Sequence, residues 1–193
     1  SGTSGTYLMG SSKNTKGFKC TWRVGGANTD ETFAGIINDW SCSGSGYTGT
    51  TNIIKQGTGD WRLTGSNTYS GTTVINGGRL IVNGKNSGTG SYTVNDGATL
   101  AGQGTISGTV LVKNGGTLQA GDTLMKKTLT LTAAVSLQSG ATVITPVTSE
   151  GFNKIMLKSA MTIGENVTLQ LAEGGLDAAP NDGTQYQVFY LSI

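Results

Sequence analysis

The sequence predicts an all-β protein that folds as a right-handed, single-stranded parallel β-helix of about nine coils. Three observations carry this prediction. A seven-residue phrase recurs along the chain, small and polar residues dominate the composition, and the apolar residues fall in short runs at a repeated spacing. Because the apolar residues recur in a pattern, we expect an ordered chain despite its apolar share of only 35%.

The composition fits a thin core. The 193 residues include 32 glycines and 2 prolines, and only 12% are charged and 7% aromatic. These values do not describe an enzyme with a thick globular interior, whereas one elongated stack of repeats needs few aromatic residues. The formal net charge is +2, and the Lys and Arg residues are scattered, so we expect no nucleic-acid partner.

The phrase that recurs reads apolar, two polar or small residues, Gly, Gly or Ala, a polar residue, apolar. It occupies residues 74–80, 94–100, 112–118, 137–143 and 163–169, with starts separated by 20, 18, 25 and 26 residues. A glycine after Asn or Asp accepts positive φ, so each phrase predicts a strand, a tight turn and a second strand. Hairpins are the competing interpretation. The repeat length favours a β-solenoid, because each unit contains further short strands.

Two more patterns follow from the repeat. Residues 22–29 match residues 61–68 at a separation of 39, which predicts two coils of about 20 residues between equivalent positions. Within the phrases, the apolar residues should stack in columns inside the helix. We therefore expect Val94, Leu100, Val112 and Leu118 to point into the core, and Thr99 to point outward.

We expect one domain over residues 1–193, a fragment of a larger exported protein. Its parts are an N-terminal coil or cap over 1–19, a repeat core over 20–121 and degenerate C-terminal coils over 122–193. No stretch approaches the roughly 18 apolar residues of a membrane span, and Ser1 to Gly10 lacks the regions of a signal peptide. The isolated domain is expected to be monomeric and not embedded in a membrane.

Residues 59–80 closely resemble the autotransporter-associated β-strand repeat of bacterial surface proteins. Residues 33–37 and 100–108 resemble the flanking coils of such proteins, and residues 183–189 resemble the closing strands of passenger domains. The resemblance implies a parallel β-helix, export, and a secreted or bacterial cell-surface location. It implies no reaction. Trp61 departs from the pattern, since an aliphatic residue is more usual there.

The sequence offers no catalytic, cofactor-binding or metal site. It has no histidine, which removes Ser/His/Asp and Cys/His nucleophilic sites and imidazole metal sites. The eleven acidic residues are dispersed, and only Asp30 and Glu31 are adjacent, in a predicted solvated loop. Asp96 and Asp122 lie in predicted turns with no basic residue expected beside them. Residues 44–49 match G-x-G-x-x-G, but no strand-helix unit surrounds them.

Two further sets of residues carry predictions. Cys20 and Cys42 are 22 residues apart, about one coil, and exported chains more often pair their cysteines, so we expect a disulfide. Trp22, Trp40 and Tyr47 would stack on sugar rings if they were exposed. The competing interpretation, which we favour, is that the aromatic residues plug or cap the N-terminal core.

Three functions remain open. The first is a non-catalytic structural or adhesive segment, a stalk or passenger, with glycans or surface molecules as partners. The second is an accessory glycan-binding module of a secreted polysaccharide-degrading protein, which requires a continuous aromatic or polar groove. The third is a degenerate polysaccharide lyase, which requires a carboxylate cluster beside Lys or Arg.

Overall fold

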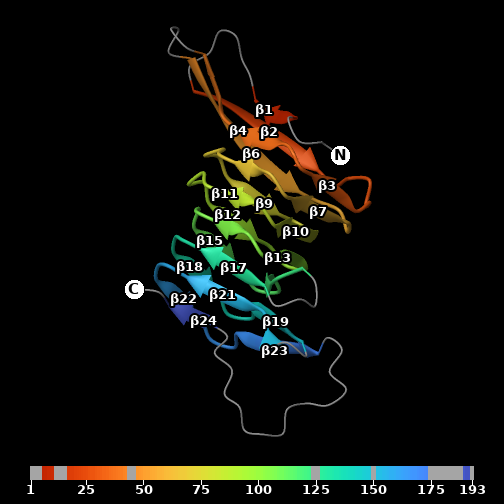
Figure 1. Ribbon diagram of the computed structural model, residues 1–193, viewed down its shortest axis with the longest axis vertical. Coiled ribbons are helices and arrows are strands. Elements are labelled where there is room, and N and C mark those ends of the chain that lie inside the picture. Colours follow the sequence, from red (N-terminus) through yellow and green to blue (C-terminus); the bar gives the residue numbers. More distant parts are fainter. Residues whose placement is uncertain are drawn as a thin grey trace, which may run out of the picture.

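The computed structural model describes residues 6–10, 17–42, 47–122, 127–148, 151–173 and 189–191. Within these residues the chain forms 24 β-strands, most of them in three sheets of parallel strands (Figure 1). No helix in the described part is long and apolar enough to cross a membrane. The strands follow one another along the long axis of the molecule in the order of the sequence, which is the arrangement of a parallel β-helix.

Each coil contributes one strand to each sheet, except that the third strand of the first coil belongs to a separate small sheet. Sheet 1 consists of β2 (Phe18–Val24), β6 (Tyr47–Lys55), β9 (Thr73–Ile75), β12 (Tyr92–Val94), β15 (Val110–Val112), β18 (Val135–Leu137) and β22 (Met161–Ile163). Sheet 2 consists of β3 (Glu31–Phe33), β7 (Asp60–Leu63), β10 (Gly78–Val82), β13 (Ala98–Gly102), β16 (Thr117–Ala120), β19 (Thr142–Thr148) and β23 (Thr168–Glu173). Sheet 3 consists of β8 (Ser66–Asn67), β11 (Lys85–Asn86), β14 (Thr105–Ile106), β17 (Thr128–Leu131), β21 (Lys154–Leu157) and β24 (Phe189–Leu191).

Two short strands and one small sheet of two strands lie outside these stacks. β1 (Tyr7–Met9) pairs with β4 (Ile36–Asn38), the third strand of the first coil. β5 (Trp40–Cys42) and β20 (Gly151–Phe152) pair antiparallel with β6 and β19. The described residues therefore form seven coils, from β2-β3-β4 to β22-β23-β24. The sequence predicts about nine coils. The number is lower because some residues form hairpins and connecting segments that add no coil.

The strand pairing confirms that most copies of the phrase occupy equivalent positions in successive coils. Val94, Val112, Leu137 and Ile163 are paired in successive strands of sheet 1. The turn glycine in the fourth position of the phrase has positive φ at Gly97, Gly115 and Gly140, with values of 68°, 72° and 79°. In the last phrase this position is Asn166, with φ of 54°. Asn is the residue after Gly that best tolerates this conformation, so the turn survives where the phrase is most degraded.

The first phrase is offset by one residue from its prediction. Val94 pairs with Ile75, and Val74 pairs with Thr93. Ile75 is fully buried, whereas Val74 lies on the outer face and is half-buried. The turn between β9 and β10 is one residue shorter than the next one, because Leu80 and Leu100 are in register in sheet 2. Shifting a strand by one residue moves every side chain to its other face. Because the turn after β9 is one residue shorter, the last inward-facing residue of that strand is Ile75 and not Val74.

The predicted repeat between residues 22–29 and 61–68 is wrong. Trp22 lies in β2 of sheet 1 and pairs with Ile53, whereas Trp61 lies in β7 of sheet 2 and pairs with Glu31 and Leu80. The two segments occupy different sides of the helix in neighbouring coils. Their similarity of sequence has no counterpart in position, because a tryptophan followed by Arg and an aliphatic residue fits any strand with one buried face.

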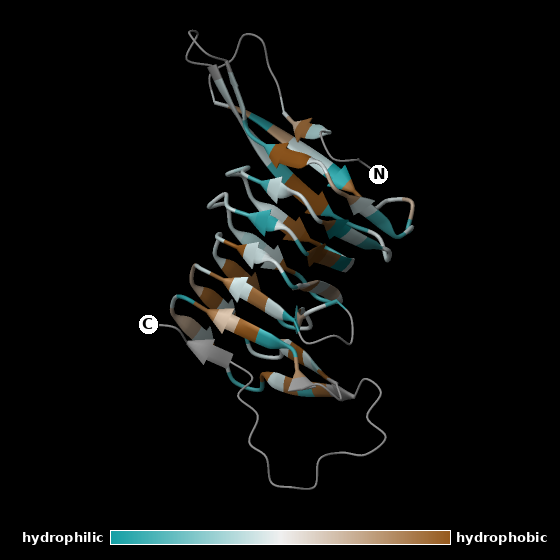
Figure 2. Cartoon of the chain, viewed as in Figure 1, coloured by the Kyte–Doolittle hydropathy of each residue, from teal (hydrophilic) through white to brown (hydrophobic). Residues whose placement is uncertain are grey.

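The interior is a single continuous column of apolar side chains. Val94, Leu100, Val112 and Leu118 are each 0% exposed, which confirms the predicted core residues. Hydrophobic and hydrophilic residues alternate along the strands in Figure 2, as expected for strands with one buried face. In coils 5 and 6 the buried core side chains are almost all aliphatic: Val110, Val112, Leu118, Ala120, Leu129, Leu131, Val135, Leu137, Ala141, Val143, Ile155 and Leu157.

The interior of coils 2 to 4 also contains buried polar groups. Lys55 is 0% exposed, and its Nζ donates to the carbonyl oxygens of Gln56, Gly57 and Gly77 at 2.9, 3.2 and 3.1 Å. All three donors of the ammonium group thus have an acceptor. Burial lowers the pKa of Lys55, an effect that the nearby carboxylates of Asp60 and Asp30 oppose.

A chain of hydrogen bonds runs through the same part of the interior. Asn67 Nδ2 donates to Asn86 Oδ1 at 2.6 Å, and Asn86 Nδ2 donates to the Tyr92 hydroxyl at 2.8 Å. The Tyr92 and Tyr69 hydroxyls are 2.9 Å apart, and Tyr69 is 2.7 Å from Thr73 Oγ1. Each member is at most 3% exposed. A fully satisfied buried network fixes which strand faces which, since a shift in register would leave its members unpaired.

The first prediction concerns the core column. Leu100→Asp should lower the free energy of unfolding by about 4 kcal/mol or more, because it buries a carboxylate without a partner. Thr99→Asp introduces the same charge on the outer face of the same strand and should be nearly neutral. Urea denaturation of both variants measures the difference. Equal losses would show that the assigned faces of β13 are wrong.

The second prediction concerns the hydroxyl network. Tyr92→Phe should cost about 1–3 kcal/mol, because it leaves Asn86 Nδ2 without its acceptor and the Tyr69 hydroxyl with Thr73 Oγ1 as its one remaining partner in the network. Tyr7→Phe is the matched control, since Tyr7 is 57% exposed. Burial also raises the pKa of Tyr92 and of Tyr69. Their stabilisation is therefore present below about pH 10 and is lost as the pH rises above it, so Tyr92→Phe should lose less stability than the wild type in that range. A wild-type pH dependence in Tyr92→Phe would contradict this.

Candidate functional site

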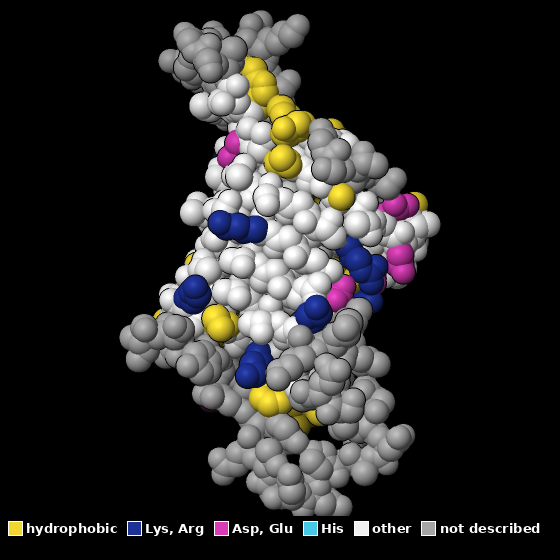
Figure 3. Space-filling model, viewed as in Figure 1, with side chains coloured by type: hydrophobic (Ala, Val, Ile, Leu, Met, Phe, Trp, Pro, Cys, Tyr) yellow, Lys and Arg dark blue, Asp and Glu magenta, His cyan; other side chains and the backbone are white. Residues whose placement is uncertain are grey.

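The outer face of sheet 2 carries a cluster of charged residues from coils that are far apart in the sequence. We call Asp60, Arg62, Arg79 and Asp122 the charged cluster. Asp60 and Arg62 lie two residues apart in β7 and so share a face, and Arg79 of β10 pairs with Asp60. Asp122 follows β16, three coils further along. Most of the face in Figure 3 is uncharged, and basic and acidic side chains lie side by side at one of its edges.

Asp60 is the centre of the cluster. Arg79 donates to it from Nε to Oδ1 at 2.7 Å and from Nη2 to Oδ2 at 2.5 Å, which is a bidentate pair. Arg62 Nη2 donates to Oδ2 at 3.1 Å. The backbone N of Asp60 donates to Asp30 Oδ1 at 2.8 Å, which ties the cluster to the first coil.

Asp122 joins the cluster from the opposite end. Its Oδ2 accepts a hydrogen bond from Asn83 Nδ2 at 2.8 Å and lies 3.6 Å from Arg62 Nε. The expectation that Asp122 lacks a basic neighbour is therefore wrong. The sequence pattern did not reveal the cluster, because Asp122 and Arg62 are 60 residues apart and come together only through the stacking of coils.

The geometry of the cluster is that of a structural ion-pair network. The hydrogen bonds from Arg79 hold the pKa of Asp60 below its ordinary value, although burial opposes them. The same bond raises the pKa of Arg79. A carboxylate with a lowered pKa is not protonated near neutral pH and does not serve as a general acid, and an arginine held by a carboxylate is not a base. Among the described residues, no group of three or more acidic residues or cysteines is placed to hold a metal ion.

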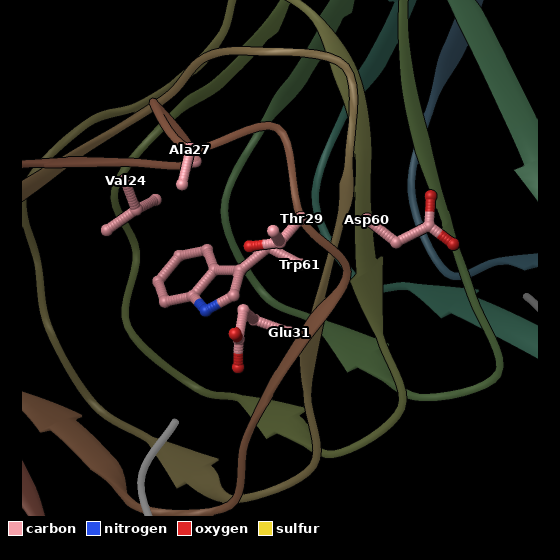
Figure 4. Close-up of a pocket in the computed structure, with 7 residues that line it drawn as sticks. Val24, Ala27, Thr29, Glu31, Asp60 and Trp61 are labelled. Carbon is pink, nitrogen blue, oxygen red and sulfur yellow. The ribbon is translucent and has the colours of Figure 1, made fainter.

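A pocket of about 310 Å³ lies beside the cluster, at the N-terminal end of the helix interior. Figure 4 shows the indole of Trp61 in its centre, with Val24, Ala27, Thr29 and Glu31 around the ring and the carboxylate of Asp60 turned away. Trp61 is 7% exposed and packs against Phe33 at a centroid distance of 6.4 Å. Trp61 is thus a core residue of the second coil that packs against Phe33, where an aliphatic residue is more usual.

The other predicted aromatic residues flank β6. Trp22 is 37% exposed and stands above Ile53 in the interior column, so it caps the core. Trp40 is half-buried and pairs with Gly49 on the other side of β6, four residues away from Ile53. The side chain of Tyr47 lies outside the described residues. Trp22 and Trp40 thus lie on opposite sides of β6, at positions four residues apart along it.

The predicted Cys20–Cys42 disulfide is not formed in this structure, because the thiol of Cys20 is free. The two cysteines lie on opposite sides of β6, where Cys20 pairs with Thr51 and Cys42 pairs with Tyr47. Four residues along a strand span about 13 Å, whereas a disulfide needs Cα atoms within about 7 Å. A spacing of about one coil does not place the cysteines on adjacent rungs, because β5 turns back to pair with β6.

A shallow groove of about 370 Å³ follows the outer face of sheet 1 across coils 4 to 7. Its lining is mainly small and polar: Ser91, Tyr92, Thr93, Thr109, Val110, Leu111, Ala134, Val135, Ser136 and Thr162. Tyr92, Val110 and Val135 are at most 2% exposed, so they contribute little surface to it. The groove therefore presents hydroxyl groups, and its only described aromatic residue is directed into the core.

Comparison with known proteins supports the resemblance stated from the sequence. Residues 53–82 match the family model of the passenger-associated-transport-repeat. The match covers the end of β6 and the strands β7, β8, β9 and β10, which are most of coil 2 and the first two strands of coil 3. No curated protein matches the chain. The matched segment is a repeat associated with passenger regions, and it contains Asp60, Arg62 and Arg79 of the charged cluster.

The third prediction concerns Asp60. Because its pKa is lowered in the folded state, its stabilisation is full above about pH 4 and is lost as the pH falls through and below that value. Asp60→Asn should therefore be less stable than the wild type near pH 7 and should lose less stability on acidification. Thermal melts across this range measure the effect. Asp96→Asn, at an exposed turn, is the control and should follow the wild type. A variant that keeps the wild-type acid dependence would contradict the role of Asp60.

Proposed function

We propose that the chain is a non-catalytic structural segment, a rigid stalk, in the passenger region of an exported bacterial surface protein. The observation that carries the proposal is the unbroken stack itself. The same three strands recur from coil to coil in one register, and the buried interior column continues from Phe33 in coil 1 to Leu157 in coil 6. Such a stack holds its two ends at a fixed separation, which is what a stalk requires.

The charged cluster supports this proposal over a degenerate lyase. A lyase needs a carboxylate set that can bind a cation, together with a basic residue that can accept a proton. Both carboxylates of the cluster are instead engaged by Arg62, Arg79 and Asn83. The one lysine with a lowered pKa, Lys55, is 0% exposed inside the helix and donates to three carbonyl groups.

A glycan-binding module is the second candidate, and the hydroxyl-lined groove of sheet 1 is the feature that favours it. Tight sugar sites usually combine polar groups with an exposed aromatic face. Among the described residues that line this groove, the only aromatic residue is buried. Binding there would be weak, with a dissociation constant on the order of a millimolar.

The fourth prediction separates the stalk from an enzyme. The purified chain should form no unsaturated or newly reducing products from pectin, alginate or xylan, with or without calcium, because Asp60 and Asp122 are held in ion pairs. Asp60→Asn and Asp122→Asn are the variants to test beside it. Products that the wild type makes and that either variant fails to make would overturn the proposal.

Calorimetry on the same preparations separates the stalk from a glycan-binding module. For a stalk, no glycan binds, and Trp22→Ala lowers the melting temperature because Trp22 caps the core. Thr93→Ala in the groove should then change nothing. Binding that Thr93→Ala weakens, without a change in melting temperature, would replace the stalk with the glycan-binding module.

A further inference from the structure

The segment that leaves sheet 2 after β16 runs backwards along the helix instead of continuing around it. Gly121 N donates to the carbonyl oxygen of Gly102 at 2.7 Å, and the two glycines form an antiparallel bridge. Gly102 belongs to coil 4. The next residue, Asp122, reaches Asn83 in coil 3 and Arg62 in coil 2. We call Gly121 and Asp122 the clasp.

The base of the clasp is fixed by coil 6. Asn153 is 0% exposed, and its Nδ2 donates to the carbonyl oxygen of Ala120 at 3.1 Å. Its Oδ1 accepts a hydrogen bond from the backbone N of Lys127 at 2.7 Å. The Asn153 side chain therefore binds the backbone at Ala120, the last residue of β16, and at Lys127, just before β17. Gly121 has φ of 73°, and a Cβ there would lie 2.5 Å from Asn153 Nδ2, so this position requires glycine.

The outer face of sheet 2 next to the clasp is closed to solvent. Ile81 and Ala101 lie between inward-facing residues of β10 and β13 and so point outward, yet both are 0% exposed. The Asp122 side chain is only 7% exposed, and Arg62 is shared between Asp60 and Asp122. A carboxylate at this depth is held by its partners, and its removal leaves a partly buried guanidinium with one acceptor fewer.

We propose that the clasp couples coils 2 to 5 into one cooperative unit. In a solenoid each coil normally contacts only its neighbours, so the end coils can open without the rest. The contacts of Asp122 with Arg62 join coil 5 directly to coil 2, across two intervening coils. Coil 2 is then unable to open without breaking a contact to coil 5. This inference goes beyond the stalk proposal, because it concerns how the stack opens. It does not depend on what the outer faces of the protein do.

The test is hydrogen exchange of the full chain, followed by mass spectrometry, in the wild type, Asp122→Ala and Asn83→Ala. In the wild type, the amides of β7, β10, β13 and β16 should exchange with similar protection. In both variants β7 and β10 should exchange at least about tenfold faster, while β16 and β21 keep their protection, because the coils then open from the N-terminal side. Asp96→Ala removes a carboxylate from an exposed turn of coil 4 and is the control.

Two outcomes would overturn the proposal. Unchanged protection of β7 in both variants would show that the clasp carries no coupling. An equal loss of protection in coils 2 to 6 would show that Asp122 contributes only to the stability of the whole stack. Asn83→Ala keeps all charges, so it gives a readout even if Asp122→Ala does not fold.

Discussion

The pairing of each strand with the equivalent strand one coil away is the constraint on which the rest of the structure depends. Parallel pairing in register places residues of equal position above one another, and the roughly 4.8 Å between strands brings their side chains into contact. The columns of the core follow from this, and so do the pairing of Asp60 with Arg79 and the stacked turns. The surroundings of a residue in this protein therefore depend more on its sheet and its column than on its neighbours along the chain.

The interior changes character along the axis. Coils 5 and 6 are filled almost entirely by aliphatic side chains, whereas coils 2 to 4 also enclose Lys55 and the hydroxyl and amide groups of the network around Tyr92. Aliphatic columns supply stability but tolerate slips between similar residues. A buried network with every member satisfied supplies specificity, because a slip leaves donors and acceptors without partners. The buried polar groups and the buried Trp61 lie in the same part of the stack.

The outer faces of sheets 1 and 2 differ in the kind of polar group that they present. Sheet 1 presents hydroxyl groups in a shallow groove, and sheet 2 presents ion pairs that are largely closed to solvent. The arrangement on sheet 2 gives the charged residues a mechanical role instead of a chemical one: Asp60 joins coils 2 and 3, and Asp122 joins coil 5 to both. A stalk made of repeats gains more from such contacts than a globular domain does, because its coils otherwise share no common core contact beyond their neighbours.

The sequence by itself determined the fold class, the strand-turn-strand unit and the core residues Val94, Leu100, Val112 and Leu118. It did so because the alternation of apolar and polar residues and the turn glycines are local properties, and they recur in each copy of the repeat. Tertiary structure decided what depends on the length of each turn and on which coils stack. The shortened turn after Ile75 shifted a strand by one residue, β5 folded back and kept Cys20 from Cys42, and Trp22 and Trp61 entered different sheets. The charged cluster belongs to this second group, since a contact between Arg62 and Asp122 exists only once the coils between them have set the distance.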